Sequence, residues 1–217
     1  MKNLIYKEFK LALPLLTILF LGFSVMTFLP GYPILCGAFF VCFGIFQSYQ
    51  LAREDNDILY SVLLPVRKTD VVRAKYATTV ILQMIAFVLC VIFTGVRMIW
   101  LSDAKVYTTN VLMAANPVFL AFVLMIFTAF NVVFLGGFFK TAYRFGKPFV
   151  TFVIVNFTII GFAEALHHFP GLGWFNTMDF SDIGRHAIIL VGAFIMYVAV
   201  TAASCKASQK RFEKIDL

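Results

Sequence analysis

The chain has 217 residues, of which 61% are hydrophobic and only 13% are charged, and its formal net charge is +7. Soluble domains carry roughly 25% charged residues, and here the few charges cluster and leave long apolar stretches between them. A transmembrane helix needs about 20 mostly apolar residues, and several stretches reach that length. The composition therefore excludes a soluble domain and predicts an all-α membrane protein with one domain, residues 1–217.

The N-terminal segment, MKNLIYKEFKLAL, predicts an interfacial helix that leads into the first span. Leu4, Ile5 and Phe9 share one helical face, and Lys7 lies away from it. Glu8 interrupts the apolar face, so a first span that simply begins early remains an alternative interpretation.

Six charge-free runs predict six transmembrane spans. Their approximate bounds are Leu11–Leu29, Ile34–Ala52, Ala77–Val96, Pro117–Phe139, Pro148–Ala163 and His186–Cys205. The first run is longer than the roughly 7–15 apolar residues of a cleavable signal peptide, so we expect it to be retained. The fifth is anomalous, because 16 residues reach only about 24 Å, which is less than a hydrocarbon core of about 30 Å.

The segment after the fifth span, residues 164–175, is too apolar for a free loop and too broken for another span. Pro170, Gly171 and Gly173 interrupt any continuous helix there. We expect short re-entrant or interfacial helices packed against protein, because irregular backbone is tolerated at membrane depth only in such places.

The lysine and arginine distribution predicts the orientation. Fifteen of these residues would lie on one side, in the N-terminal segment, residues 53–76, residues 140–147 and the C-terminal tail. The other side would hold three, Arg97, Lys105 and Arg185. Both termini are therefore expected in the cytoplasm, and an even number of spans agrees. The net charge then reflects topology, and no nucleic acid partner is expected, because no basic face carries base-reading aromatics.

A compact charged segment, EDNDILYSVLLPVRKTDVVRAKY, separates the second and third predicted spans at residues 54–76. Its apolar residues share one face of a two-turn helix: Ile58, Leu59, Val62 and Leu63. Asn56 or Asp57 would cap this helix and Pro65 would end it. Thr69 or Asp70 would start a second helix that continues into the third span.

A two-turn helix is unstable alone in water and needs a surface that covers its apolar face. That surface could be the chain's own span ends, the lipid surface or a cytoplasmic partner protein. Periodicity does not choose between these alternatives.

The charged segment resembles the first cytoplasmic loop of bacterial ABC type-2 exporter permeases. The matching residues are Glu54, Leu59, Ser61, Leu64, Pro65, Val66, Arg67, Val71, Ala74, Lys75 and Tyr76. The opening KNLIYKEFKL resembles the N-terminal elbow helix of that family, and the closing RFEKIDL resembles its charged tail. The resemblance also covers the predicted topology, with six spans, cytoplasmic termini and a re-entrant segment after the fifth span.

The resemblance implies that the two-turn helix is a coupling helix, which docks into a groove of a separate ATPase subunit. The ATPase-coupling residues would be Asp57, Ile58, Leu59, Val62, Leu63 and Pro65. ATP and Mg²⁺ would be bound by the partner, and this chain would hold no cofactor. A phosphate-cradling loop needs G-x-x-x-x-G-K-[ST]. The nearest fragment is Gly146-Lys147, which Pro148 follows, so we expect the chain not to be an enzyme.

Members of the resembled family work as two permeases with two ATPases, which implies a homodimer or a closely related heterodimer in the bacterial cytoplasmic membrane. Similar-looking relatives include exporters of amphipathic toxin peptides such as phenol-soluble modulins. Together with spans rich in Phe and Met, this favours export of amphipathic or hydrophobic toxin-like or antimicrobial-like peptides. Export of a lipid or drug, and an ATP-independent channel or scaffold, remain alternatives.

Four polar residues lie in or beside predicted spans. Gln83, Asn131 and Asn156 would either bond to neighbouring helices, at about 0.6–2 kcal/mol each, or line a substrate cavity. Glu164 borders the apolar core and would either pair with Arg97 or Arg185, or act as an outer gate.

The pattern Glu164-x-x-His167-His168 also raises an intramembrane metalloenzyme as an alternative from a different class. One Glu-x-x-His is only half of a di-iron bundle site, and the H-E-x-x-H of zinc proteases is absent from the sequence. The cysteines lie in apolar runs, where thiols behave as small hydrophobes, so neither a disulfide framework nor a metal cluster is expected. They are Cys36, Cys42, Cys90 and Cys205.

Overall fold

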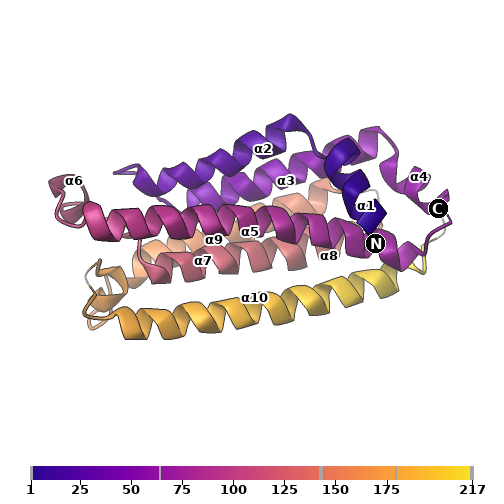
Figure 1. Ribbon diagram of the computed structural model, residues 1–217. Helices are drawn as coiled ribbons and strands as arrows, with labels where there is room; N and C mark the ends of the chain where they lie inside the picture. Colours follow the sequence, from indigo (N-terminus) through magenta and orange to yellow (C-terminus); the bar gives the residue numbers. More distant parts are fainter. Residues whose placement is uncertain (1, 64, 142–143, 179, 216–217) are drawn as a thin grey trace.

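The computed structural model describes residues 2–63, 65–141, 144–178 and 180–215, without the side chains of residues 11 and 12. These residues form helices and connecting loops with no strand, as the composition predicts. The long helices run side by side along one axis, with α6 at one end of the bundle and α4 at the other (Figure 1).

The α-helices are α1 (Lys2–Lys7), α2 (Leu15–Leu21), α3 (Cys36–Glu54), α4 (Asp57–Leu63), α5 (Lys68–Trp100), α6 (Lys105–Thr108), α7 (Pro117–Ala129), α8 (Gly136–Phe138), α9 (Gly146–Leu166) and α10 (Ile183–Phe212). The π-helical segments are η1 (Glu8–Ala12) and η3 (Phe130–Leu135), and the 3-10 segments are η2 (Gly22–Phe28) and η4 (Gly173–Asn176).

Four helices of the described chain are long and apolar enough to cross a membrane: α5, the continuous run Pro117–Phe138, α9 and α10. A fifth follows if the bent pair of segments Lys2–Lys10 and Leu15–Phe28 forms one span. Helix α3 is less apolar, because Gln47, Ser48 and Gln50 lie in its second half. Helices thus occupy all six predicted positions, and four or five of them meet the requirements for a span.

The first predicted span, Leu11–Leu29, contains a break in the helix. Pro14 lies inside the predicted run, and the residue before it, Leu13, is extended at φ −96° and ψ 105°, as steric contact with a following proline requires. The helix therefore restarts at Leu15, and Lys2–Lys10 makes an angle of 91° with Leu15–Phe28. The predicted run from Leu11 thus contains a helix break, which Pro14 explains.

The fifth predicted span is not short. Helix α9 has 21 residues, which correspond to about 31 Å and match the hydrocarbon core. It includes Glu164 and ends only at Leu166. Where short re-entrant or interfacial helices were expected after it, the described segment contains turns and one short 3-10 helix, η4.

The start of α5 also corrects the sequence analysis. The residue before the helix is Arg67, and it makes no side-chain capping bond. Thr69 and Asp70, which were expected to cap the helix, lie inside its first turn. From Lys68, α5 continues for 33 residues, or about 50 Å, so one helix joins the charged segment to the far end of the bundle.

An aromatic core lies between α3, the α7–α8 run and α9. The rings of Phe46 and Phe149 stack with centroids 3.7 Å apart, and Phe134 meets Phe46 edge-on at 5.4 Å. Phe130 and Phe152 are fully buried beside them. Aromatic pairs add to the stabilisation from apolar burial, so part of the phenylalanine content is explained by helix packing.

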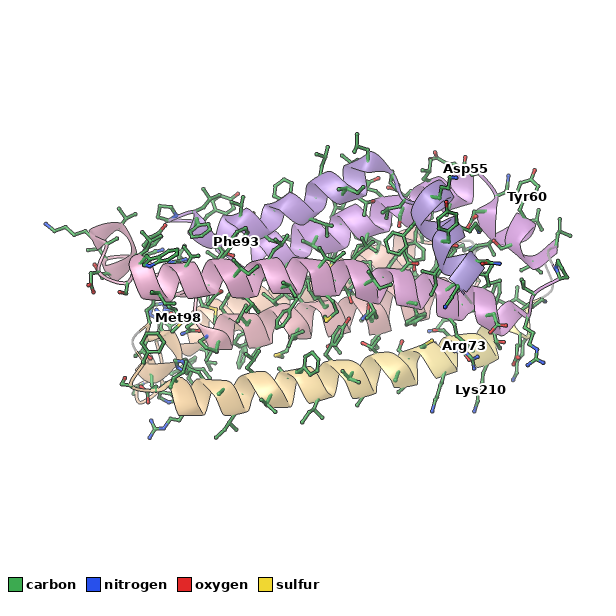
Figure 2. All side chains as sticks on the ribbon, viewed as in Figure 1. Asp55, Tyr60, Arg73, Phe93, Met98 and Lys210 are labelled. Atoms are coloured by element: carbon green, nitrogen blue, oxygen red, sulfur yellow. The ribbon has the colours of Figure 1, made fainter. Side chains whose placement is uncertain are left out.

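Both termini lie at one end of the bundle (Figure 1), where Lys68 Nζ donates to the carbonyl oxygen of Ile215 at 2.7 Å. Figure 2 shows Asp55, Tyr60, Arg73 and Lys210 at this end and Met98 near the opposite end. We call the end that holds the two termini the terminal end. The chain segments at this end belong to the four that were predicted to share the lysine- and arginine-rich side: the N-terminal segment, residues 53–76, the loop before α9 and the C-terminal tail.

Candidate functional site

Helix α4 lies at the terminal end and packs against α3 and α5 (Figure 1). Ile58 is buried and Val62 is half-buried against the core. The exposed fractions of Leu59, Tyr60 and Leu63 are 44%, 65% and 74%. The apolar face predicted from periodicity is therefore divided, since Ile58 and Val62 contact the chain itself while Leu59 and Leu63 face outward with Tyr60.

Four charged side chains form a cluster beneath α4, which we call the ion cluster: Lys7, Glu8, Asp57 and Lys75. Lys75 Nζ lies 2.8 Å from Glu8 Oε2 and 2.9 Å from Asp57 Oδ2. Lys7 Nζ lies 2.5 Å from Asp57 Oδ1 and 3.3 Å from Glu8 Oε1. The charges alternate and cancel, and the four side chains come from α1, η1, α4 and α5.

The ion cluster is shielded from solvent. The Lys75 and Glu8 side chains are 3% and 7% exposed, and those of Asp57 and Lys7 are 13% and 18% exposed. Burial would raise the pKa of the Asp57 carboxyl, but nearby Lys75 and Lys7 outweigh it and hold the pKa below its ordinary value. Buried ions tolerate desolvation only when their partners stay in place, so the cluster fixes α4 relative to the N-terminal segment and α5.

Two residues of the cluster were missed as partners in the sequence analysis. Glu8 was noted only as an interruption of an apolar face, and Lys75 only as part of the resembled motif. A carboxylate on an otherwise apolar face is itself a signal for a buried cation partner. Asp57 was expected among the ATPase-coupling residues, and the structure places it inside the cluster.

The resembled motif also supplies internal bonds on either side of Lys75. Ser61 Oγ accepts a hydrogen bond from Lys7 Nζ at 2.6 Å, and donates to the Asp57 carbonyl oxygen at 2.7 Å. Tyr76 OH lies 3.0 Å from Ser204 Oγ and 2.9 Å from Ser208 Oγ, both on α10. The motif therefore ties α4 to the N-terminal segment and α5 to α10.

A buried polar network joins α5, η3 and α10 farther along the bundle. Gln83 and Asn131 form a reciprocal amide pair, with both N–O distances 3.0 Å. Tyr197 OH donates to Gln83 Oε1 at 2.8 Å, and Asn131 Nδ2 donates to Thr201 Oγ1 at 3.1 Å. Both amides are fully buried, so this conformation supports the interhelical-bond interpretation of Gln83 and Asn131 over cavity lining.

The other two polar residues lie apart from this network. Asn156 on α9 is fully buried, and neither of its side-chain polar atoms has a hydrogen-bond partner among the residues that the structure describes. Glu164 Oε2 accepts from the backbone N–H of Met113 at 2.8 Å. The expected arginine partners bond elsewhere. Arg97 Nη1 donates to the Thr27 carbonyl oxygen at 2.6 Å, and Arg185 pairs with Asp182 at 3.2 Å.

The histidines after Glu164 have structural contacts in the loop region at the opposite end of the bundle from the termini. His167 Nε2 lies 3.0 Å from the Val111 carbonyl oxygen, and the rings of His167 and His168 are 4.1 Å apart. Among the residues that the structure describes, no group of three or more His, Cys, Asp or Glu side chains could hold a metal ion.

Residues 3–213 match a family model described as ABC-2 family transporter protein. No curated protein and no solved structure matches the chain. The match covers nearly the whole length, including the N-terminal segment, α4 and the end of α10.

Proposed function

Because this chain belongs to the ABC-2 family of transporter proteins, we propose that it is the permease subunit of an ATP-driven exporter in the bacterial cytoplasmic membrane. A separate ATPase subunit binds ATP and Mg²⁺ and supplies the free energy. Helix α4 is the coupling helix, and the N-terminal segment is the elbow helix that precedes the first of six spans.

The observation that carries this proposal is the outward side of α4. Leu59, Tyr60 and Leu63 are exposed at the charged terminal end, and a group of exposed apolar side chains in a charged region is typical of a protein interaction site. The ion cluster holds α4 against the N-terminal segment and α5. A displacement of α4 by an ATPase would therefore reach the far end of the bundle through the continuous helix α5.

The coupling proposal is tested with Leu63→Asp, because Leu63 is the most exposed apolar side chain of α4. Val62→Asp is less informative, since Val62 also packs against the core. A carboxylate in an apolar contact is unfavourable, so Leu63→Asp should abolish ATPase co-purification and transport while the chain still inserts and elutes normally. Val111→Asp, on an exposed apolar residue of the opposite end, is the matched control. Normal coupling in Leu63→Asp would mean that α4 lies on lipid.

Both termini are proposed to lie in the cytoplasm. Lys105 and Lys210 are exposed on opposite ends of the bundle. In a background without the native cysteines, a membrane-impermeant thiol reagent should label Lys105→Cys in intact cells. It should label Lys210→Cys only after permeabilisation. The reverse pattern would invert the proposed topology.

The proposed cargo is an amphipathic or hydrophobic peptide of the toxin or antimicrobial class, carried by a homodimer or closely related heterodimer. The support is the resemblance to exporters of such peptides. The phenylalanine content adds little, because many of these rings fill the core. Amphipathic peptides should raise the ATPase rate of the reconstituted complex. If lipids or drugs raise it instead, the cargo class changes, and flux without ATP would indicate a channel.

A further inference from the structure

A groove of about 800 Å³ opens at the terminal end, between the η3–α8 run, the start of α9 and the C-terminal part of α10. Its lining residues lie within 132–141, 144–151 and 200–211. None of the residues of α4 or the ion cluster lines it. The groove is therefore separate from the proposed coupling surface, and its volume is in the range of ligand pockets, about 300–1,000 Å³.

The groove has a cationic mouth. Four basic residues line it, and no aspartate or glutamate is among its lining residues. The four are Lys140, Arg144, Lys147 and Arg211. A lysine- and arginine-rich loop alone would be explained by topology. Here, cations from two separate parts of the chain converge on one concavity, and that convergence favours an anionic ligand.

One of the four cations and the backbone contact between α8 and α9 have defined positions at the groove. Arg211 Nη1 donates to the Gly136 carbonyl oxygen at 3.1 Å, which fixes the guanidinium beside α8. At Gly137, an added Cβ would lie 2.8 Å from Pro148 Cβ, so only glycine allows α8 to approach α9 this closely. The amino end of α9 also lies at the mouth, where its partial positive charge adds to the side-chain charges.

The wall of the groove is apolar. Its side chains include Val132, Val133, Pro148, Val200 and Ala203. A small soluble anion would use the cations and leave this wall uncovered. A ligand with an anionic head and an apolar body would satisfy both surfaces. Basic pockets between helices on the cytoplasmic side of membrane proteins bind lipid headgroups in this way.

We propose that the groove binds one anionic phospholipid from the membrane leaflet on the side of the terminal end. The headgroup phosphate contacts the four cations at the mouth, and the acyl chains lie along the wall formed by the η3–α8 run and α10. The proposed orientation makes this the cytoplasmic leaflet. A lipid bound there contacts both α9 and α10, which are the least buried by the rest of the protein among the four candidate spans. Lipid composition would therefore affect how these two helices pack.

The test is a native mass spectrometry titration of the full chain in detergent with phosphatidylglycerol and phosphatidylcholine of identical acyl chains. The groove variant is Lys140→Gln with Lys147→Gln. The matched control is Lys206→Gln with Lys210→Gln, which removes the same charge from exposed residues of α10 outside the groove. The charge-retaining control is Lys140→Arg with Lys147→Arg.

The unmodified chain should bind phosphatidylglycerol more tightly than phosphatidylcholine. The groove variant should bind phosphatidylglycerol at least about 10-fold more weakly, and both control variants should stay within about 2-fold of the unmodified chain. Equal losses in the groove variant and the Lys206/Lys210 control would overturn the proposal. So would equal binding of the two lipids, or displacement of phosphatidylglycerol by millimolar inorganic phosphate.

A second pair of variants tests the apolar wall without changing charge. Ala203 lines the groove, whereas the neighbouring exposed Ala202 does not. Ala203→Trp should fill the groove and reduce phosphatidylglycerol binding, and Ala202→Trp should leave it unchanged. Unchanged binding in Ala203→Trp would show that the acyl chains do not occupy this wall, which also overturns the proposal.

Discussion

Lys75 Nζ lies 2.8 Å from Glu8 Oε2, across 67 positions of the sequence, and both side chains are almost completely shielded from solvent. Asp57 Oδ2 lies 2.9 Å from the same ammonium group. The N-terminal segment, α4 and α5 therefore share one buried ammonium group, and changes to its partners should be felt by all three elements.

Glu8→Gln should destabilise the protein. The change removes one negative charge and leaves Lys75 with Asp57, which Lys7 also contacts. Removing one partner of a buried ion pair costs about 3–5 kcal/mol. We expect a lower thermal unfolding midpoint in detergent, with Glu213→Gln in the exposed tail as the control. The double variant Glu8→Gln with Lys75→Gln restores neutrality and should lose less than the sum of the two single changes. Strict additivity would argue against direct coupling.

Asp57 should make stability depend on acidic pH. Its pKa is held below the ordinary value by Lys75 and Lys7 despite burial. Because the native state favours the ionised carboxyl, the stabilisation is complete above the unfolded pKa of about 3.9 and is lost as the pH falls through the lower native value.

The unfolding midpoint should therefore fall on acidification below about pH 4. This decrease should be shallower in Asp57→Asn than in the unmodified chain, while the exposed Asp103→Asn should keep the original slope. An identical slope in Asp57→Asn would show that the carboxyl is not held in its ionised form.

The secondary structure of this chain follows largely from hydropathy, but its long-range pairs do not. Apolar runs locate the long helices because 20 or so residues without charge have few other stable environments. The end of α9 was misplaced at Ala163 because a carboxylate normally leaves the apolar core. Glu164 stays in the helix, since its Oε2 accepts from Met113 N–H, and a bond to a residue 51 positions away leaves no local signal.

At the candidate site, too, the helix could be predicted from the sequence and its contacts could not. The apolar period predicts a two-turn helix at α4, and Pro65 predicts where it ends. The same period does not predict that Ile58 is buried while its neighbour Leu59 is exposed. Which of two adjacent apolar residues faces inward depends on where α3 and α5 lie. The Gln83–Asn131 pair was foreseeable only as a general preference of polar amides in spans for interhelical bonds.

The Gln83–Asn131 pair should show a favourable coupling energy. Each amide is fully buried, so Gln83→Leu alone leaves Asn131 with unsatisfied groups, and the converse holds for Asn131→Leu. Each single change should cost about 0.6–2 kcal/mol, and the double change should cost less than the sum. A double-mutant cycle on the unfolding free energy measures this, with the exposed Ile85→Leu as a control for repacking of α5. A coupling energy of zero would contradict the observed bonds.

Gly44→Ala should separate α2 from α3. Thr17 Oγ1 on α2 donates to the Gly44 carbonyl oxygen at 2.7 Å, which draws the two backbones together. A Cβ at Gly44 would overlap the Cβ of Phe20, an atom close to the backbone that cannot rotate away. Overpacking of this kind typically costs 1–3 kcal/mol.

Gly192→Ala on α10 is the matched control, because nothing lies within 4 Å of the added Cβ and alanine favours a helix interior by about 1 kcal/mol over glycine. Gly44→Ala should lower the thermal unfolding midpoint, and Gly192→Ala should leave it unchanged or raise it. A higher midpoint in both variants would mean that helix propensity, and not the close approach at Gly44, determines the response. The α2–α3 contact would then have room to relax.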